Sequence, residues 1–386
     1  MKLNSIINSR FKQLSFSVAA AFMFLGFTSL STSPLALAYS SSNLQPGSYS
    51  SVSSVTSSAG PKYLGHALTG KNPDDVSISG NTAFVVNYGS SSLQIFNISN
   101  PADITLISTT ATGLHPQVVS THDDYAYVGV SGDGNTGGNA LTERLQIFNV
   151  TNTAKPVLVN GEGILSGYGP IDSITISSTN YLYATEYDFQ ANSSGVEIYN
   201  ISDPNSLTTA SGNFDIDSGP NRATITLDKN LFIESGSKMQ IYNISTNPTK
   251  PTLDNLGNQN TGTYICGGLT GFRISGEYAY VACRGYNRIY VVNVSNPADP
   301  VLSNGVNGFT LPAGAYPSDL AIVGNYAEVL GASSNILYQY QITSGTKLTL
   351  DGTASTGGNP VSIGQDGDTV FVANYNSNTL GAFSVE

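Results

Sequence analysis

Apolar and polar positions alternate in short runs along most of the chain, and the runs return in a fixed order. A Pro or Gly turn opens each unit, followed by an apolar strand, a tight turn, a second strand, a polar loop and a third strand. The second strand reads TAFVVN, YAYVGV, YLYATE, NLFIES, YAYVAC, YAEVLG and TVFVAN. The third reads LQIFNIS, LQIFNVT, VEIYNIS, MQIYNIS, IYVVNVS, LYQYQIT and LGAFSVE. Alternation with a period of two is typical of half-buried antiparallel strands.

The unit occurs seven times, with a mean spacing of about 48 residues over the six intervals between the first and last opening prolines. A weaker fourth strand follows each third strand. The opening residues are Pro73, Pro116, Pro170, Pro220, Gly267–Gly268, Pro317 and Pro360. Four strands at this period are typical of a propeller blade, whereas solenoid repeats are usually shorter. The pattern predicts an all-β, seven-bladed β-propeller with four antiparallel strands per blade.

The two ends of the repeat region indicate how the ring closes. The seventh unit reaches Glu386 after its third strand, without a fourth. The segment Pro61–Gly65, before the first unit, resembles fourth strands such as Pro297–Leu302. We therefore expect the N-terminal strand to complete the last blade, which would leave no open sheet edge.

The N-terminal part predicts export. Three basic residues precede an apolar run at Leu14–Leu30, and small residues at Ala36–Ala38 provide a peptidase site. The run contains four Ser or Thr residues and is shorter than the ~20 apolar residues of a membrane span, so an anchor is the less favoured alternative. We expect a signal peptide over 1–38, and a protein that is secreted or on the cell surface (periplasmic in a Gram-negative cell).

Two further segments follow the predicted signal peptide. Residues 39–60 are Ser-rich and nearly uncharged, as expected of a flexible linker, and residues 61–386 would form the propeller. No later apolar run is long enough to span a bilayer.

The composition limits the classes of molecule that this chain is expected to bind. Charged residues make up only 11% of the chain, there is no Trp, and the net charge is −11, which becomes −14 without the three basic residues of the signal peptide. A nucleic-acid backbone is therefore excluded as an expected partner.

Two motifs allow more than one interpretation. Cys266 and Cys283 are the only cysteines, and they could form a disulfide or remain buried thiols. The Asn-x-Ser/Thr motif could accept glycans or turn the backbone after the third strand, and its recurrence in the repeat favours the turn. It occurs at Asn97, Asn149, Asn192, Asn200, Asn243 and Asn293.

The repeats resemble those of LVIVD-repeat and YVTN-type β-propeller proteins. The LVIVD likeness is carried by Ile289–Pro297 (IYVVNVSNP), and the YVTN likeness by Val370–Thr379 (VFVANYNSNT). The resemblance implies a propeller fold over nearly the whole mature chain. These families include surface binding proteins and lactonase-like enzymes, so the resemblance implies no single activity.

The channel mouth is the expected functional site. In propellers, the loops that lead into each first strand and the loops between second and third strands meet on one face. Asp75, Asp172, Asp319 and Arg222 each stand two residues after an opening proline, so three carboxylates and one guanidinium are expected at equivalent positions around the axis. The predicted ligand-binding residues there are Asp75, His115, Asp172, Glu186, Arg222, Arg284 and Asp319. Converging carboxylates repel one another unless a cation offsets them, which indicates a site for calcium or a polar ligand. The alternative is a ring of solvated residues around a water-filled channel.

These features favour a secreted or surface-bound binding or scaffold module for an extracellular protein or polysaccharide. A lactonase-like hydrolase at the channel mouth is the alternative, with His115 and the carboxylates as its chemical groups. Neither G-x-S-x-G nor HExxH occurs, so the sequence leaves catalysis undecided.

Overall fold

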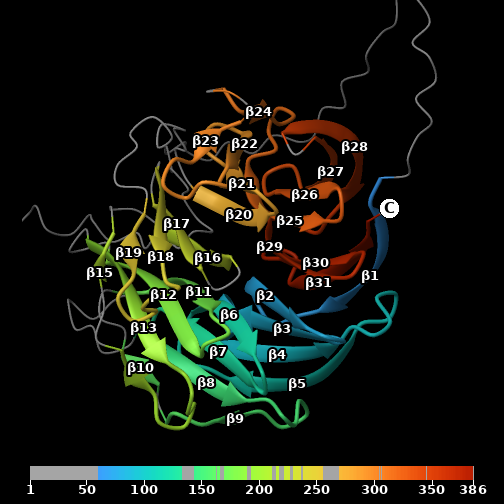
Figure 1. Cartoon of the computed structure of the whole chain (residues 1–386). Helices are drawn as coiled ribbons and strands as arrows, with labels where there is room; N and C mark the ends of the chain where they lie inside the picture. The colour runs from blue at the N-terminus through green and yellow to red at the C-terminus, as the bar shows by residue number, and fades with distance from the viewer. Residues whose placement is uncertain are drawn as a thin grey trace, which may run out of the picture.

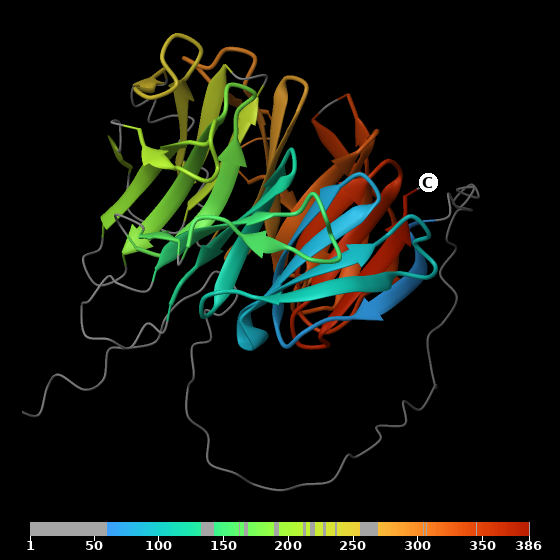
Figure 2. The same ribbon diagram turned by 90° about the horizontal axis from the view of Figure 1, so that it is seen from below.

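Seven antiparallel sheets surround a central axis, so the predicted seven-bladed, all-β propeller is confirmed (Figure 1). Figure 2 shows the ring from its side. The computed structural model describes residues 60–385, apart from 133–142, 162, 166–168, 189–192, 211–213, 217–220, 227–228, 236–237, 255–268, 304, 306 and 345. No helix in these described ranges is long and apolar enough to cross a membrane.

Each blade is a meander whose first strand lies nearest the axis. The first strands are β2 (Pro73–Ser79), β6 (Pro116–His122), β11 (Ile171–Ile176), β16 (Asn221–Thr226), β20 (Leu269–Ser275), β25 (Pro317–Val323) and β29 (Pro360–Asp366). The second strands are β3 (Thr82–Asn87), β7 (Tyr125–Val130), β12 (Tyr181–Asp188), β17 (Asn230–Ser235), β21 (Tyr278–Cys283), β26 (Tyr326–Gly331) and β30 (Thr369–Asn374). The third strands are β4 (Ser92–Asn97), β8 (Arg144–Asn149), β13 (Ser193–Asn200), β18 (Lys238–Asn243), β22 (Arg288–Asn293), β27 (Ile336–Thr343) and β31 (Thr379–Ser384). A 3₁₀ turn, η1 (Tyr88–Ser90), follows β3.

The outer strands vary most, as their weak sequence pattern indicated. Blades 1 and 6 have long outer strands, β5 (Thr105–Ala111) and β28 (Lys347–Ser355). In blades 2, 3 and 5 the fourth strand is split into two short pieces that pair with the same third strand. These pieces are β9 (Val157–Leu158) with β10 (Ile164–Leu165), β14 (Thr208–Thr209) with β15 (Phe214–Asp215), and β23 (Val301–Leu302) with β24 (Phe309–Thr310). Blade 4 contributes β19 (Thr252–Leu253).

The N-terminal strand closes the ring, as predicted. Strand β1 (Lys62–Leu68) pairs antiparallel with β31, with Tyr63 opposite Phe383. It is the fourth strand of blade 7, so the last blade is assembled from both ends of the propeller. The first strands also pack against one another around the axis, from β2 to β29 and back to β2.

The core lies between blades. Phe84 and Val86 of blade 1 pack on Ala126 and Val128 of blade 2, and the other neighbouring blades share similar apolar clusters. Burial of one such side chain contributes about 1.5–3 kcal/mol. Ring closure thus depends on the face-to-face contacts as well as on strand pairing.

The Asn-x-Ser/Thr asparagines form turns. In Asn97, for example, Oδ1 accepts a hydrogen bond from the backbone N–H of Ser99 at 2.9 Å. The same i to i+2 bond recurs at Asn149, Asn200, Asn243 and Asn293. Asn192, the sixth motif, lies outside the described residues. The recurrence explains why the repeat keeps asparagine there, because its side chain caps the turn between third and fourth strands.

Candidate functional site

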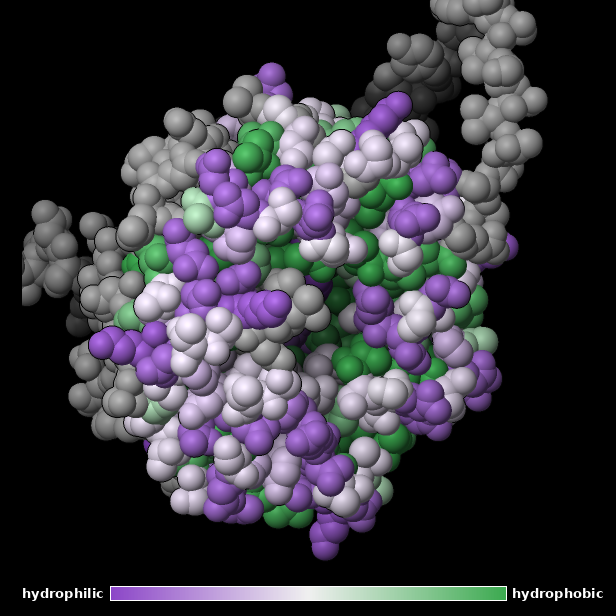
Figure 3. Space-filling view, in the orientation of Figure 1, coloured by the Kyte–Doolittle hydropathy of each residue, from purple (hydrophilic) through white to green (hydrophobic). Residues whose placement is uncertain are grey.

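The loops that lead into the first strands and the loops between second and third strands lie on one side of the ring, here named the loop face. The other side, the turn face, carries the turns between first and second strands and between third and fourth strands. The surface is hollowed at the axis of the ring (Figure 3).

Asp75 lies on β2, but its carboxylate turns toward the neighbouring blades. The backbone N–H of Val119, in blade 2, donates to Oδ2 at 2.9 Å. The hydroxyl of Ser362, in blade 7, donates to Oδ1 at 2.6 Å. One half-buried side chain therefore links three blades.

Asp319 has the equivalent role in blade 6. Its side chain is 1% exposed, and its Oδ2 accepts the backbone N–H of Ile363, in blade 7, at 3.3 Å. The guanidinium of Arg273, on β20 of blade 5, lies 3.2 Å from the same oxygen. Hydrogen bonds to a charged group contribute about 1.5–3 kcal/mol, so this carboxylate stabilises the ring.

A β-bulge explains these orientations. In β2, Pro73 pairs with Asn87 and Asp75 pairs with Val86, so two residues of one strand oppose one of the other. The same irregularity occurs at the start of β6, β11, β20, β25 and β29. A bulge re-aims the following side chain, here toward the next blade.

Asp172 does not occupy the position in blade 3 that Asp75 occupies in blade 1. In blade 3, Ile171 takes the pairing position of Pro73, so Ser173 matches Asp75 and Asp172 matches Asp74 at the bulge. The prediction that three carboxylates share one ring position was therefore wrong for Asp172. Its side chain is half-buried.

The remaining predicted charges are dispersed. Arg222 lies on β16 opposite Glu234, in the position of Asp75, and its side chain is outside the described part. Glu186, at 0% exposure on β12, is enclosed in blade 3. Arg284 follows β21 on the loop face, where burial lowers the pKa of its guanidinium. The structure thus distributes these residues over separate environments.

His115 directly precedes β6, on the loop face. Its ring stacks on Tyr88 with a centroid separation of 4.4 Å and an angle of 18° between the planes. Its Nδ1 lies 2.7 Å from the carbonyl oxygen of Gly132. The backbone of His115 is left-handed, with φ of 56°.

The left-handed backbone recurs at the residue before the opening proline. Asn72, Tyr316 and Asn359 have φ of 55°, 47° and 51°. Each backbone N–H donates to an asparagine Oδ1 of the preceding blade, at 2.7–2.8 Å; the acceptors are Asn378, Asn287 and Asn335 respectively. Asparagine, aspartate and histidine are the residues other than glycine that adopt this conformation most often, whereas other side chains are strained by about 1 kcal/mol or more. Tyr316 therefore keeps a large ring where asparagine fits the backbone better.

These rings belong to a series on the loop face, which we name the aromatic arc. It spans five consecutive blades and comprises Tyr286, Tyr316, Tyr375, Tyr88 and His115. Tyr286 and Tyr316 are exposed by 47% and 45%. Burial and the charge of Asp74 raise the pKa of Tyr375 to about 12 and also raise that of Tyr88. Both phenols therefore remain protonated and can donate hydrogen bonds at neutral pH.

The sequence reasoning missed Tyr88 and Tyr375, although a signal for them exists. Each directly follows the buried asparagine that ends a second strand, Asn87 or Asn374. The backbone N–H of Tyr88 is held by the carbonyl of Asn72 at 2.8 Å. An Asn-Tyr pair at the end of a second strand is therefore the sequence signal for an aromatic ring on the loop face.

The metal and disulfide predictions remain open. Among the described residues, no three or more His, Cys, Asp or Glu side chains are grouped so that they could hold a metal ion. Calcium stays a sequence-based prediction. Cys283 is fully buried at the end of β21, whereas Cys266 lies outside the described ranges, so the disulfide also stays a prediction.

Comparison with protein families identifies LVIVD repeats in the chain. The family model of the LVIVD repeat matches residues 70–112 and 270–308, which correspond to most of blades 1 and 5. A comparison with curated proteins finds no match.

Solved structures share the fold at low sequence identity. A putative 6-phosphogluconolactonase from Bacteroides uniformis is 13% identical, covers 77% of this chain and 89% of its own, and has a TM-score of 0.61. A protein from Lactobacillus plantarum is 18% identical over 77% of this chain and 88% of its own, with a TM-score of 0.60. Virginiamycin B lyase from Staphylococcus aureus is 12% identical over 83% of this chain and 99% of its own, with a TM-score of 0.58. At these identities the likeness establishes the propeller alone.

Proposed function

We propose that this propeller is an exported binding module that takes a glycan on its loop face. The aromatic arc is the observation that carries the proposal. A sugar ring has an apolar C–H face and a hydroxyl edge, so it pairs with flat rings flanked by hydrogen-bonding groups. The arc provides both, because amide side chains such as Asn72 and Asn359 alternate with its rings.

Backbone strain supports a role beyond folding for one member of the arc. Tyr316 occupies a left-handed position that asparagine fills in blades 1 and 7. Strain of this kind is concentrated at functional sites. Because Tyr316 is 45% exposed, its ring is best explained by what it contacts outside the chain.

Hydrolysis is the second candidate, since one of the structural neighbours is named as a putative 6-phosphogluconolactonase. A hydrolase would need a carboxylate free to act beside His115. Asp75 and Asp319 instead accept backbone hydrogen bonds that join blades. This arrangement favours binding over catalysis.

The test is a glycan array probed with the chain from residue 60 onward, followed by calorimetric titration of the best glycan. His115→Asn and Tyr316→Asn restore the residue that other blades use, so we expect both variants to fold and to bind at least tenfold more weakly. Tyr63→Thr, which removes an exposed ring from β1 away from the arc, is the matched control. Unchanged binding in both arc variants would refute the proposal, as would the absence of any bound glycan.

Export and hydrolysis are tested separately. The N terminus of protein recovered outside the cytoplasm should begin at Tyr39. Incubation with a panel of lactones should give no turnover above that of the His115→Asn variant. Turnover that this variant abolishes would favour the hydrolase.

A further inference from the structure

A pocket of about 500 Å³ lies between blades 6 and 7, near the loop face. Its floor is formed by β1 and β31 on the Phe383 side of blade 7, which packs against blade 6. Its rim includes the end of β28, which lies beside β1 at the outer edge of the ring (Figure 1). The volume is within the range of small-molecule sites.

The floor of this pocket contains a glycine that departs from the repeat. Gly381 lies on β31 opposite Val372. The other six blades place a long side chain at the same third-strand position; the residues are Gln94, Gln146, Glu197, Gln240, Tyr290 and Tyr338. The backbone of Gly381 has no positive φ, so it does not require glycine. Blade 7 therefore lacks a side chain that its backbone conformation allows.

Blade 1 shows which contacts such a side chain makes. The Oε1 atom of Gln94 accepts the backbone N–H of Gly70 at 2.7 Å and the side-chain amide of Asn87 at 3.2 Å. Its Nε2 donates to the hydroxyl of Thr109, on the outer strand, at 3.2 Å. In blade 2, Gln146 accepts the corresponding loop N–H at 2.8 Å. One carboxamide group thus reaches the entering loop and the second strand together.

Blade 7 has the same frame without this carboxamide. Gly357 takes the place of Gly70, and in both loops the preceding threonine donates to the glycine carbonyl. Asn374, at 1% exposure, takes the place of Asn87 at the end of the second strand. A Cβ on Gly357 would lie 3.1 Å from Nδ2 of Asn374, and a Cβ on Gly381 would lie 3.5 Å from the same atom. Both donors of the blade 1 site therefore border one space.

The outer part of the pocket is aromatic. His66 lies on β1 opposite Gly381, where blade 1 has Thr109. Tyr63 is 51% exposed, and its hydroxyl is hydrogen-bonded to Nδ1 of His66. Its ring meets the ring of Phe383 edge to face, with a centroid separation of 5.6 Å. An aliphatic chain that leaves the inner end of the pocket would contact these rings.

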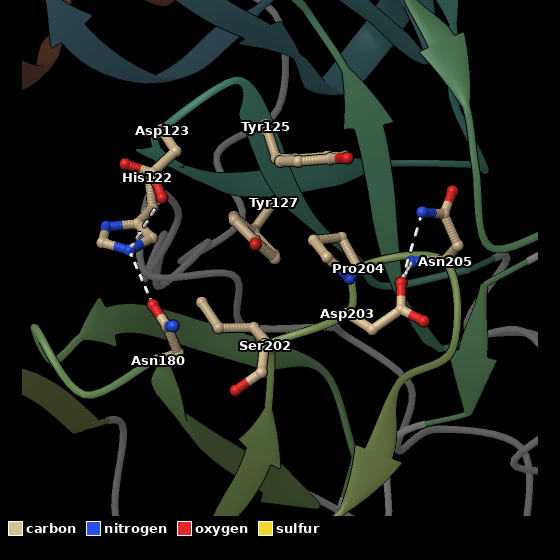
Figure 4. Close-up of a pocket in the computed structure, with 10 residues that line it drawn as sticks. His122, Asp123, Tyr125, Tyr127, Asn180, Ser202, Asp203, Pro204 and Asn205 are labelled. Atoms are coloured by element: carbon tan, nitrogen blue, oxygen red, sulfur yellow. Dashed lines mark hydrogen bonds and ion pairs between the residues drawn. The ribbon is translucent and has the colours of Figure 1, made fainter.

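A smaller hollow of about 320 Å³, on the turn face between blades 2 and 3, differs in this respect (Figure 4). Its polar side chains bond within the chain: Nε2 of His122 lies 3.3 Å from Oδ1 of Asn180, and Oδ1 of Asp203 accepts a backbone N–H at 3.1 Å. The blade 7 pocket, in contrast, lies where other blades place a bonding side chain.

We propose that the blade 7 pocket binds a primary carboxamide on a short aliphatic stem, which is the chemistry of a glutamine side chain. The carboxamide oxygen accepts from the N–H of Gly357 and from Nδ2 of Asn374, as Oε1 of Gln94 does in blade 1. The stem contacts the ring of Tyr63. Free glutamine and a glutamine residue of a peptide both present this group. The site is separate from the aromatic arc, none of whose rings lines it.

The test is saturation-transfer NMR titration with L-glutamine, Nα-acetyl-glutamine amide and Nα-acetyl-norleucine amide. We expect a glutamine probe to bind, and the stronger of the two tells whether the free amino acid or a peptide residue is the source. The norleucine probe keeps the stem but lacks the side-chain carboxamide, so it should bind at least about tenfold more weakly. Equal binding of the norleucine probe, or no binding of either glutamine probe, would overturn the proposal.

Gly381→Gln restores the residue of blades 1, 2 and 4, so its own carboxamide should take the place of the ligand. We expect the thermal midpoint to stay or rise and the affinity for glutamine to fall at least about tenfold. Gly381→Ala is the matched control, because it brings the same Cβ contact of 3.3 Å with the Phe383 ring but no carboxamide. Its affinity should stay within about threefold of the parent's. Equal losses in the two variants, or full affinity in folded Gly381→Gln, would refute the assignment.

Tyr63→Thr tests the outer part of the pocket. This variant should weaken glutamine binding roughly threefold or more and leave glycan binding at the aromatic arc unchanged. If Gly381→Gln does not fold, full affinity for glutamine in Tyr63→Thr refutes the proposal instead.

Discussion

Glu328 breaks the pattern of the second strands, and its effect on stability can be calculated. In the other six blades its position holds an aromatic ring, at Phe84, Tyr127, Tyr183, Phe232, Tyr280 and Phe371. The residue opposite it on the third strand is Gln339, where the other blades have Ile, Val or Ala. Glu328 is 0% exposed, and neither of its carboxylate oxygens has a hydrogen-bond partner among the described residues.

The surroundings of Glu328 are mostly apolar. It shares a strand face with Leu330, which packs in the cluster between blades 6 and 7 with Val370, Val372 and Phe383. Burial raises the pKa of Glu328 from its ordinary 4.5 to about 8, and the charge of Asp351 adds to the effect. The carboxyl group is therefore mainly protonated at neutral pH in the folded chain.

The sign of the effect follows from proton linkage. An acid whose pKa is higher in the folded state than in the unfolded state does not change the free energy of unfolding below pH 4.5. Between pH 4.5 and pH 8 it lowers this free energy increasingly, and above pH 8 the loss stays constant. Each pH unit corresponds to about 1.4 kcal/mol, so the two and a half units from 4.5 to 7 amount to about 3.5 kcal/mol. With an unfolding entropy of about 2.1 cal/mol/K per residue over the propeller, that is a shift of roughly 5 °C in the midpoint.

The assay is thermal unfolding followed by circular dichroism between pH 5 and pH 8. We expect Glu328→Gln to melt higher than the parent, by an increment that grows by several degrees across this range. Glu277→Gln, at an exposed turn, is the matched control and should show no such growth. A constant difference between parent and Glu328→Gln would refute the reasoning, because it would mean that Glu328 titrates alike in both states.

Three further predictions concern the stability of the propeller. Asp75→Ala leaves two hydrogen-bond donors of neighbouring blades without their acceptor, so it should lower the free energy of unfolding, measured with denaturant, by about 2–4 kcal/mol. The control Asp103→Ala, at an exposed position, should lower it by less than about 0.5 kcal/mol. Deletion of Lys62–Leu68 exposes the edge of β31 and should convert a monodisperse peak in size-exclusion chromatography to aggregate, unlike deletion of residues 1–59. A bond between Cys266 and Cys283 should appear as a cross-linked peptide in non-reducing mass spectrometry, and its reduction should cost about 3 kcal/mol; a stability indifferent to reductant would contradict it.

Much of the fold could be predicted because the repeat encodes it. The apolar runs of each unit predicted the blade count, and the missing fourth strand of the last unit predicted the pairing of β1 with β31. The split outer strands were harder to predict, because two-residue pieces such as β9 and β10 have too few positions to show alternation.

The site was less predictable because side-chain direction depends on local irregularity. Asp75 and Asp172 both lie two residues after an opening proline, so the sequence pattern placed them at equivalent positions of their blades. In blade 3, however, Ile171 rather than Pro170 pairs with the second strand, which moves Asp172 by one position. The bulges then turn Asp75 and Asp319 onto the neighbouring blades. Neither the one-residue offset nor the bulge is visible in a pattern of apolar and polar positions.

The central claim is that the aromatic arc is retained for binding and at the expense of stability. It is tested most directly by measuring the thermal midpoint and the glycan affinity of Tyr316→Asn on the same sample. The account predicts that the midpoint stays or rises, because asparagine relieves the left-handed strain, while the affinity falls at least tenfold. Full affinity together with a lower midpoint would contradict it, since Tyr316 would then serve the fold.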